Sequence, residues 1–238
     1  MNFTNSMNFI RPKVINKQKN KPKIKKATNV FISIGRKCGV RYNIEKVIGK
    51  KETHFFDWLI ITDMKCVNAI LKTNDIKNLI NLSTVKKDKK NPYGFTKNTY
   101  RYHITSLSYC ESLHDVPSGS GKQQELALVQ RYVRRYNRLI KIIKNNNINI
   151  FFIRNGDINE IERNQFIKNI LNHNSNCNFK LVECSYTTKS NSRYYTNINL
   201  NNYKIDTSRD IGDWKLTNFN WKNIFNEIKK IKVFYTLG

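Results

Sequence analysis

The sequence predicts an α/β fold: a single domain with a mixed or mostly parallel sheet flanked by helices. From residue 123 onward the apolar pattern alternates between helix, strand, helix and strand, which is typical of parallel strands joined by helical crossovers. A strand pattern followed by a helical pattern also occurs at residues 30–48. The 238 residues are 39% hydrophobic and contain no internal repeat, which suits one packed core. We therefore expect one domain at residues 30–238, preceded by a basic, flexible tail at residues 1–29.

The first predicted elements follow one another closely after the tail. The run Val30–Ile34, "VFISI", is short and β-branched and is followed by a glycine, which predicts a buried strand. Residues 40–48 carry apolar side chains at helical spacing, and Gly49 is expected to cap the end of that helix. After a second apolar run, "THFFDWLII", the pair Thr62-Asp63 offers an N-cap for a helix that ends near residue 72.

The clearest helix covers residues 123–144. Apolar and aromatic residues recur on one face, and arginines occupy much of the other, Arg135 among them. Tyr132 and Tyr136 fall on the apolar face, so we expect them in the core rather than in a nucleic-acid interface. The remaining predicted elements are a loop at 85–99, strands at 100–108, 147–154 and 179–185, a shorter strand near 194–200, a helix at 158–172 with Ile161, Phe166, Ile167, Ile170 and Leu171 inward, and a helix at 219–231.

Positive charge dominates the composition. There are 43 Lys plus Arg against 17 Asp plus Glu, a formal net charge of +26. Such a surplus favours acidic partners such as nucleic acid, anionic membrane surfaces or acidic proteins. However, the lysines are scattered together with Asn and Ile, as the composition bias of an AT-rich genome would also produce. The tail at 1–29 has eight basic residues and no acidic one, so it either contacts nucleic acid or an acidic partner or is a solvated extension.

Several kinds of site and location are not supported by the sequence. The five cysteines form no C-x-x-C pair and no two histidines have the i, i+4 spacing of a helical zinc site, so we expect free thiols in a reducing compartment and no metal. The stretch at 116–124 lacks the glycine and the Ser or Thr that a P-loop requires, and we expect no cofactor.

No long apolar run or signal-type N-terminus is present, which predicts no membrane span and an intracellular, cytoplasmic location. The oligomeric state has no signal in the sequence.

Cys38 is the sharpest candidate for chemistry. It follows the first predicted strand by four residues and precedes a predicted helix. Backbone N–H groups and the helix dipole at such a position stabilise a thiolate, and Arg36, Lys37 and Arg41 would add to this effect. A thiolate attacks a carbonyl carbon when a base lies within reach and N–H donors hold the oxyanion. The alternative is a small structural cysteine in a strand-to-helix turn.

A thiol nucleophile needs a base, and His114 is the first choice because it lies where a strand passes into a loop. Asp115 cannot easily orient the same imidazole, since neighbouring side chains in an extended chain point apart. The orienting carboxylate would then come from Asp57 or Asp157, each at the end of a predicted strand. His103 is the rival base, but it lies inside an alternating strand, where a core or surface histidine is more common.

These stretches together form a recognisable set. Five motifs stand in the order of a known family: Gly35-x-x-Cys38, Phe56-Asp57-Trp58, His114-Asp115, Tyr132-x-Arg134-Arg135 and a strand that ends in Arg154. Over residues 30–185 the sequence thus resembles the family labelled "putative papain-like cysteine peptidase".

The resemblance implies hydrolysis of a peptide or amide bond in a peptide or protein substrate. It implies Cys38 as nucleophile and His114 as base, and we assign Asp57 to orient the histidine. The supporting residues would be Gly35, Trp58, Asp115 and Arg154. The papain signature around the cysteine is absent except for Cys38-Gly39. Two alternatives stay open: a thiol-dependent hydrolase or transferase on a doubly wound α/β scaffold, and a non-enzymatic basic protein that binds nucleic acid or an acidic partner.

Overall fold

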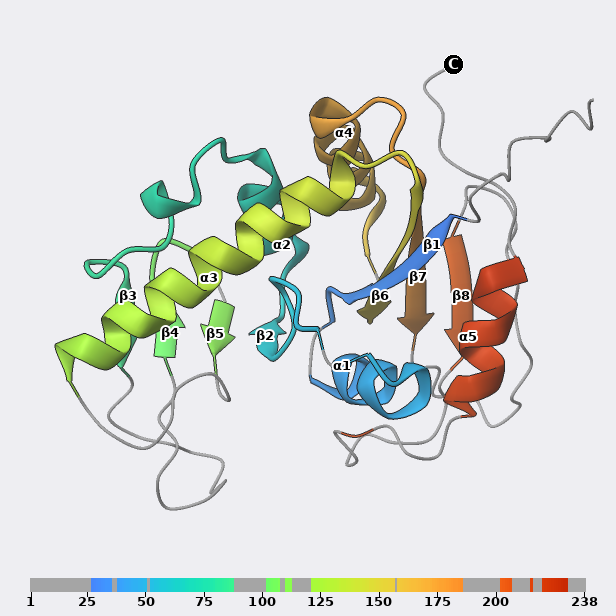
Figure 1. The fold of residues 1–238 in the computed structure, drawn as a ribbon, viewed down its shortest axis with the longest axis horizontal. Coiled ribbons are helices and arrows are strands. Elements are labelled where there is room, and N and C mark those ends of the chain that lie inside the picture. Colours follow the sequence, from blue (N-terminus) through green and yellow to red (C-terminus); the bar gives the residue numbers. More distant parts are fainter. Residues whose placement is uncertain are drawn as a thin grey trace, which may run out of the picture.

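In the computed structural model the chain forms two four-stranded sheets that lie side by side, with helices packed around them (Figure 1). The structure describes residues 27–35, 38–50, 52–87, 102–107, 110–112, 121–156, 158–185, 202–206, 215 and 220–230. The predicted α/β class, with helices flanking the strands, is confirmed. Of the described strands, four form a parallel sheet and four form a separate antiparallel sheet.

The first sheet is parallel throughout its described strands, in the order β1-β6-β7-β8. Its strands are β1 (Thr28–Ser33), β6 (Ile148–Asn155), β7 (Phe179–Ser185) and β8 (Asn202–Asp206). Parallel strands bring their carboxyl ends to the same edge of the sheet, which is where α/β folds place ligands.

The second sheet is antiparallel, in the order β2-β5-β4-β3. Its strands are β2 (Leu59–Ile61), β5 (Cys110–Ser112), β4 (Tyr102–Ile104) and β3 (Val85–Lys87). Each has only three residues, so the sheet depends on the helices that cover it rather than on long ladders.

Helices connect and cover the sheets, and α3 runs diagonally from the side of β3 and β4 up to α4 (Figure 1). The helices are α1 (Gly39–Asn43), the π-helix η1 (Ile44–Ile48), α2 (Met64–Lys72), the 3₁₀ helix η2 (Ile76–Asn78), α3 (Lys122–Ile143), α4 (Glu160–His173) and α5 (Trp221–Lys230). Two predicted caps are confirmed. Gly49 ends η1 with a left-handed φ of 75°, and the Asp63 carboxylate begins α2 by accepting a hydrogen bond from the Lys65 N–H at 2.8 Å.

Side chains from Val30 onward in β1 and from Ile150 to Arg154 in β6 are buried on both faces of the parallel sheet, which explains the continuous apolar runs in these two strands. Alternate residues face opposite sides, so Phe31 joins the cluster packed on α1 and α5, while Ile32 joins the larger cluster under α2, α3 and α4. Phe31 also stacks on Phe151 of β6 with ring centroids 4.9 Å apart. The carboxyl end of β1, from which the candidate site begins, is therefore held firmly in place.

Most side-chain predictions for the helices are confirmed, but two are wrong. Tyr132 and Tyr136 are buried in the core, as expected. Arg135, predicted on the solvated face of α3, is buried, and its guanidinium lies 5.5 Å from the centre of the Tyr132 ring. Ile161, predicted inward, is 82% exposed, because it is nine residues from the buried Ile170 and nine residues place two side chains on opposite sides of a helix. The predicted strand near 194–200 lies outside the described residues.

Candidate active site

Cys38 lies at the carboxyl end of β1 and is the N-cap residue of α1, as the sequence predicts. Its carbonyl accepts a hydrogen bond from the Tyr42 N–H at 3.0 Å, which closes the first helical turn. The turn before it is tied back to the strand, because the Gly35 N–H points to the Ser33 Oγ at 3.4 Å. Cys38 is 6% exposed and makes no side-chain capping bond.

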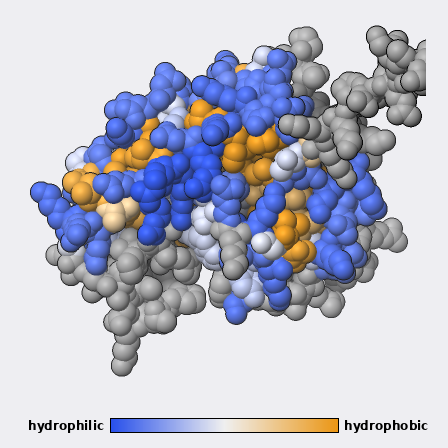
Figure 2. Space-filling view, viewed as in Figure 1, coloured by the Kyte–Doolittle hydropathy of each residue, from blue (hydrophilic) through white to orange (hydrophobic). Residues whose placement is uncertain are grey.

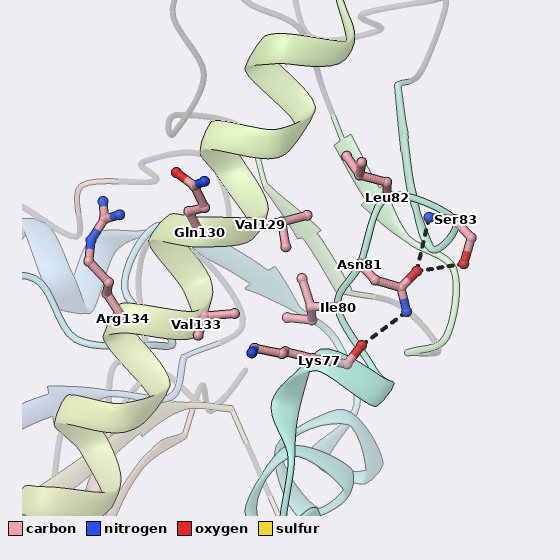
Figure 3. A pocket seen from close by; sticks show the side chains of 9 residues that line it. All are labelled: Lys77, Ile80, Asn81, Leu82, Ser83, Val129, Gln130, Val133 and Arg134. Atoms are coloured by element: carbon pink, nitrogen blue, oxygen red, sulfur yellow. Dashed lines mark hydrogen bonds between the residues drawn. The ribbon is translucent and has the colours of Figure 1, made fainter.

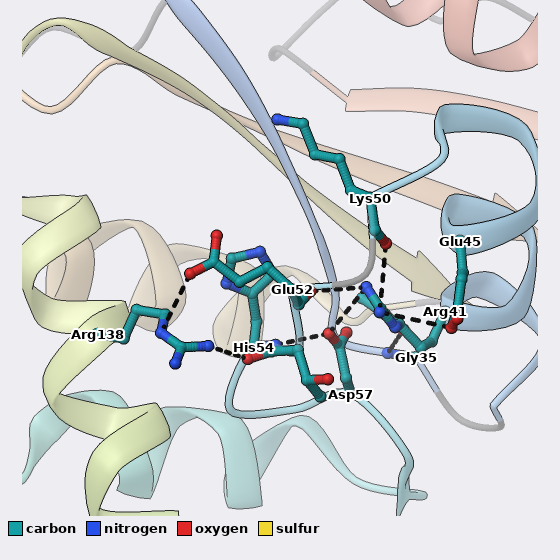
Figure 4. Close-up of polar contacts among 10 residues, drawn as sticks. Gly35, Arg41, Glu45, Lys50, Glu52, His54, Asp57 and Arg138 are labelled. Carbon is teal, nitrogen blue, oxygen red and sulfur yellow. Dashed lines mark hydrogen bonds and ion pairs between the residues drawn. The ribbon is translucent and has the colours of Figure 1, made fainter.

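Arg41, one helical turn after Cys38, is almost completely buried. A buried guanidinium is tolerated only when oxygen acceptors surround it. Within the described part of the chain these acceptors include Glu52 O at 3.0 Å, Lys50 O at 3.4 Å, Asp57 Oδ2 at 3.4 Å and Glu45 Oε2 at 3.5 Å. Arg41 therefore fixes the helix of Cys38 against the segment 50–57 (Figure 4).

Asp57 is the buried acid of this cluster, with no exposed surface. Its Oδ2 accepts a hydrogen bond from the His54 N–H at 2.7 Å and faces Arg41. Burial raises the pKa of Asp57 from 3.8 to about 7, although Arg41 and the backbones of His54 and Ser33 lower it. Oδ1 is enclosed and has no well-formed hydrogen bond within the described part of the chain.

His54 is the residue in this cluster that the sequence interpretation missed. Burial first, and then the charges of Arg41 and Arg138, lower the pKa of its imidazole from 6.5 to about 4, so the ring is neutral at pH 7. Its buried Nδ1 has no hydrogen-bond partner among the residues that the structure describes. The available signal was a polar pair three residues apart, His54 and Asp57, inside the otherwise apolar run "THFFDWLII".

The segment that carries His54 is also held from the side of α3. Arg138 donates from Nη1 to the Thr53 carbonyl at 2.8 Å, and its Nε lies 3.2 Å from Glu52 Oε1. Figure 4 shows Arg138 and Arg41 approaching the segment from opposite sides. The two arginines therefore position this loop between α1 and α3.

Trp58 follows Asp57 with a φ of 65°, which places a bulky residue in the left-handed region. This conformation is costly for any residue except glycine and is found where the surroundings enforce it, often at functional sites. Trp58 is half-buried, whereas Phe55, Phe56 and Asp57 are fully buried. The left-handed turn thus lets Asp57 enter the core immediately before β2 begins.

Arg154, at the end of β6, connects the two sheets. Its Nη1 donates to the carbonyls of Ile34 at 3.0 Å and Ile61 at 3.3 Å, and its Nη2 donates to the carbonyl of Thr62 at 3.2 Å. The side chain is buried, and its acceptors are the residues that follow or end β1 and β2. Arg154 therefore anchors the chain four residues before Cys38.

Of the residues proposed as the base or as its partner, only some lie within the described part of the chain. His103 lies on β4, where its Nδ1 is 3.4 Å from Glu111 Oε1 of β5. His114, Asp115 and Asp157 lie outside the described residues. The strand leading to His114 is described up to Ser112, which pairs with Leu59 of β2.

The other thiols lie in different surroundings. Cys66, Cys110 and Cys177 are buried and form no disulfide. Burial raises the pKa of Cys177 to about 12, and the neighbouring Cys66 thiol together with burial raises the pKa of Cys110. A high thiol pKa leaves little thiolate at neutral pH, so Cys110 and Cys177 are poor nucleophiles.

Within the described ranges, no group of three or more His, Cys, Asp or Glu side chains could hold a metal ion. Among the described helices, none is both long and apolar enough to cross a membrane. The basic tail lies almost entirely outside the described part, so its predicted contact with nucleic acid or an acidic partner stays a prediction.

Comparison with known proteins agrees with the resemblance that the motifs indicate. An uncharacterized protein of Acanthamoeba polyphaga mimivirus is 23% identical over 217 residues, which covers 82% of this chain and 96% of that protein. No solved structure matches the chain. A family profile matches residues 29–188, which is more than half of the chain. The chain belongs to the family described as "Putative papain-like cysteine peptidase".

Proposed function

We propose that this protein is a cysteine-nucleophile hydrolase of peptide or amide bonds, with Cys38 as nucleophile, His114 as general base and Asp57 as the group that orients the base. The observation that carries the proposal is the link between Arg41 and Asp57. It joins the helix whose N-cap is Cys38 to a buried carboxyl group two residues before β2, and β2 pairs with the strand that leads toward His114.

The position of Cys38 suits a thiolate. The helix α1 continues directly into η1, so helical backbone runs from Gly39 to Ile48 behind the cysteine. Unpaired N–H groups at the start of such a segment stabilise a negative charge on sulfur and can donate to the oxyanion that forms on a substrate carbonyl.

The strand register supports His114 as the base. Ser112 of β5 pairs with Leu59, two residues after Asp57. Consecutive Cα atoms are about 3.8 Å apart, so the Cα of His114 lies within about 7.6 Å of the Cα of Ser112. Residues 55–58 form a turn rather than an extension of β2, so this short reach, and not a continued ladder, is what would let His114 approach Asp57.

Asp57 offers what an imidazole base needs. Its buried Oδ1 lacks a well-formed hydrogen bond in the described structure, and buried polar atoms are nearly always paired in native proteins. An imidazole N–H from His114 is a donor of the right kind. That bond would fix the ring so that its other nitrogen accepts the thiol proton, as in catalytic triads generally.

These roles give a balanced reaction. His114 takes the proton of Cys38, and the thiolate attacks the carbonyl carbon of the substrate. The protonated imidazole then gives its proton to the leaving amine as the C–N bond breaks and a thioester remains. Water, deprotonated by the same imidazole, then attacks the thioester carbonyl. The C–S bond breaks, the acid is released, and the imidazolium returns its proton to the Cys38 thiolate.

The parallel sheet also suits the alternative scaffold considered from the sequence. Cys38 follows the first strand of a parallel sheet at its carboxyl edge, the usual ligand side of α/β folds. A transferase on this scaffold would use the same thioester and differ only in the acceptor, an amine or alcohol in place of water.

A peptide library incubated with the full chain tests the proposal, with products identified by mass spectrometry. The variants are Cys38→Ser and His114→Ala, with Cys177→Ser and His103→Ala as matched controls. We expect cleavage to disappear in Cys38→Ser and to fall by about 100-fold or more in His114→Ala, while both controls remain active. Equal cleavage by the wild type and Cys38→Ser would overturn the proposal.

A further inference from the structure

A pocket of about 630 Å³ lies between α3 and the turn that follows η2, away from the cluster around Asp57 (Figure 3). This volume is in the range of sites for small molecules. Its apolar surface comes from Leu82 on the turn and from Val129 and Val133 on α3, with the fully buried Ile80 behind them. Its described lining residues include none of Cys38, Arg41, His54 and Asp57, so the pocket is separate from the candidate active site.

The wall formed by the turn is held in place before any ligand arrives. The Asn81 side chain donates to the Lys77 carbonyl at 3.0 Å and accepts from the Ser83 N–H at 2.9 Å. The Thr84 hydroxyl donates to the Leu79 carbonyl at 2.9 Å. A pocket with such a preformed wall loses little conformational entropy on binding.

The ionisable side chains that line the pocket are basic. Among the described lining residues they are Lys77 and Arg134, and neither side chain forms an ion pair within the described part of the chain. The nearby Asp75 carboxylate accepts a hydrogen bond from the Lys77 backbone N–H at 3.0 Å. Figure 3 shows the Lys77 side chain crossing between the turn and α3 toward Val133. An anionic group at this position would gain a charge-assisted hydrogen bond, while a cation would be repelled.

The apolar stripe of α3 extends beyond the pocket. Leu126 is 43% exposed and lies on the same face as Val129 and Val133, three and seven residues further on. Figure 2 shows hydrophobic residues gathered in the region of α3 and bordered by hydrophilic ones. A bound ligand with an elongated apolar group can therefore extend from the pocket along the surface of α3.

We propose that this pocket binds an anionic amphiphile with a single alkyl chain and a carboxylate head group, of the medium-chain fatty acid class. The alkyl chain lies against Leu82, Val129 and Val133, and the carboxylate lies at Lys77.

Titration of sodium decanoate into the full chain, followed by methyl NMR, tests the proposal. We expect the methyl resonances of Val129 and Val133 to shift together with those of Ile80 and Leu82. Affinity should rise from octanoate to decanoate to dodecanoate by up to about tenfold per step, because each step buries two more methylenes. Decyltrimethylammonium, with the same chain and opposite charge, should bind at least about tenfold more weakly. Equal binding of decanoate and decyltrimethylammonium, or no shift with decanoate, would overturn the proposal.

Two variants separate a specific site from attraction to a basic protein. Lys77→Glu should weaken decanoate binding by about tenfold, whereas Lys141→Glu, an equal charge change on an exposed residue of α3 outside the pocket, should leave it unchanged. Val133→Trp should fill the pocket and abolish the shifts, with an unchanged thermal midpoint as the control for folding. An equal loss in Lys77→Glu and Lys141→Glu would contradict the proposal. So would an acidic peptide that shifts the same methyl groups at lower concentration than decanoate.

Discussion

Arg41 and Asp57 form an ion pair inside the protein: Arg41 Nη1 lies 3.4 Å from Asp57 Oδ2, and the two side chains are 2% and 0% exposed. The pair joins α1, which begins at Cys38, to the segment that precedes β2. A buried pair of this kind adds little net stability compared with apolar residues, but the loss of one partner leaves an uncompensated charge. The structure of the candidate site therefore depends on both residues together.

Arg41→Met should lower the free energy of unfolding by about 3–5 kcal/mol near pH 8, because Asp57 then remains buried without its cation. The double variant Arg41→Met/Asp57→Asn should lose less than the sum of the single variants. Denaturant unfolding of the wild type, Arg41→Met, Asp57→Asn and the double variant measures this coupling. Lys141→Met, a change at an exposed residue, is the control. Additive losses would show that the two side chains do not interact energetically.

Asp57 and His54 should give stability opposite dependences on pH. The raised pKa of Asp57 means that the folded state holds a proton which the unfolded state releases, so its contribution is present below about pH 3.8 and is lost as pH rises through about 7. The lowered pKa of His54 means the reverse, so its contribution is present above pH 6.5 and is lost as pH falls toward about 4. Between these limits the two effects largely cancel.

Variants at Asp57 and at His54 should reveal the two opposite pH dependences of the free energy of unfolding separately. Relative to the wild type, the stability of Asp57→Asn should rise with pH between about 4 and 6.5, and that of His54→Gln should fall, each by up to about 1.4 kcal/mol per pH unit. Unfolding midpoints measured at several pH values test this. Parallel pH curves for the wild type and both variants would mean that neither pKa is shifted by folding.

At position 58 a glycine variant should be more stable than an alanine variant, which is the reverse of the usual order. At most positions glycine is less stable than alanine, but at a φ of 65° the alanine Cβ is strained and glycine is not. We expect Trp58→Gly to be more stable than Trp58→Ala by about 1 kcal/mol. Thermal unfolding of both variants provides the comparison, and an alanine variant as stable as the glycine variant would show that the left-handed backbone relaxes.

Local signals explain which parts of the fold could be predicted. The strand that leads to Gly35, the glycine cap at position 49 and the carboxylate cap at Asp63 are each specified by neighbouring residues, and all are confirmed. The antiparallel sheet had weaker signals, because its three-residue strands carry little periodicity. Ile161 shows the limit of counting apolar residues, since a helix can carry one on its exposed side.

The candidate site was predictable only in part. The sequence predicted Cys38 and Asp57 as site residues, and their roles stay a prediction; it also assigned Arg41 to the thiolate. In the structure the guanidinium of Arg41 is shared among Asp57, Glu45 and two carbonyls. These contacts of Arg41 depend on how α1 packs against the segment that contains Lys50, Glu52 and Asp57. Such packing produces no periodic pattern of residues in the sequence. His54 was missed for a related reason, because a lone histidine in an apolar run is usually a core residue.

The pH dependence of iodoacetamide labelling, with each modified cysteine located by peptide mapping, tests the central claim most directly. If Cys38 is an activated nucleophile, it should label rapidly below about pH 7, since an unperturbed thiol titrates near about 8.5. The buried Cys110 and Cys177, whose pKa values are raised, should label slowly. His114→Ala should remove the advantage of Cys38, and His103→Ala should preserve it. Labelling of Cys38 at the rate of the other cysteines, or unchanged by His114→Ala, would show that Cys38 is a packing residue and would contradict the proposed reaction.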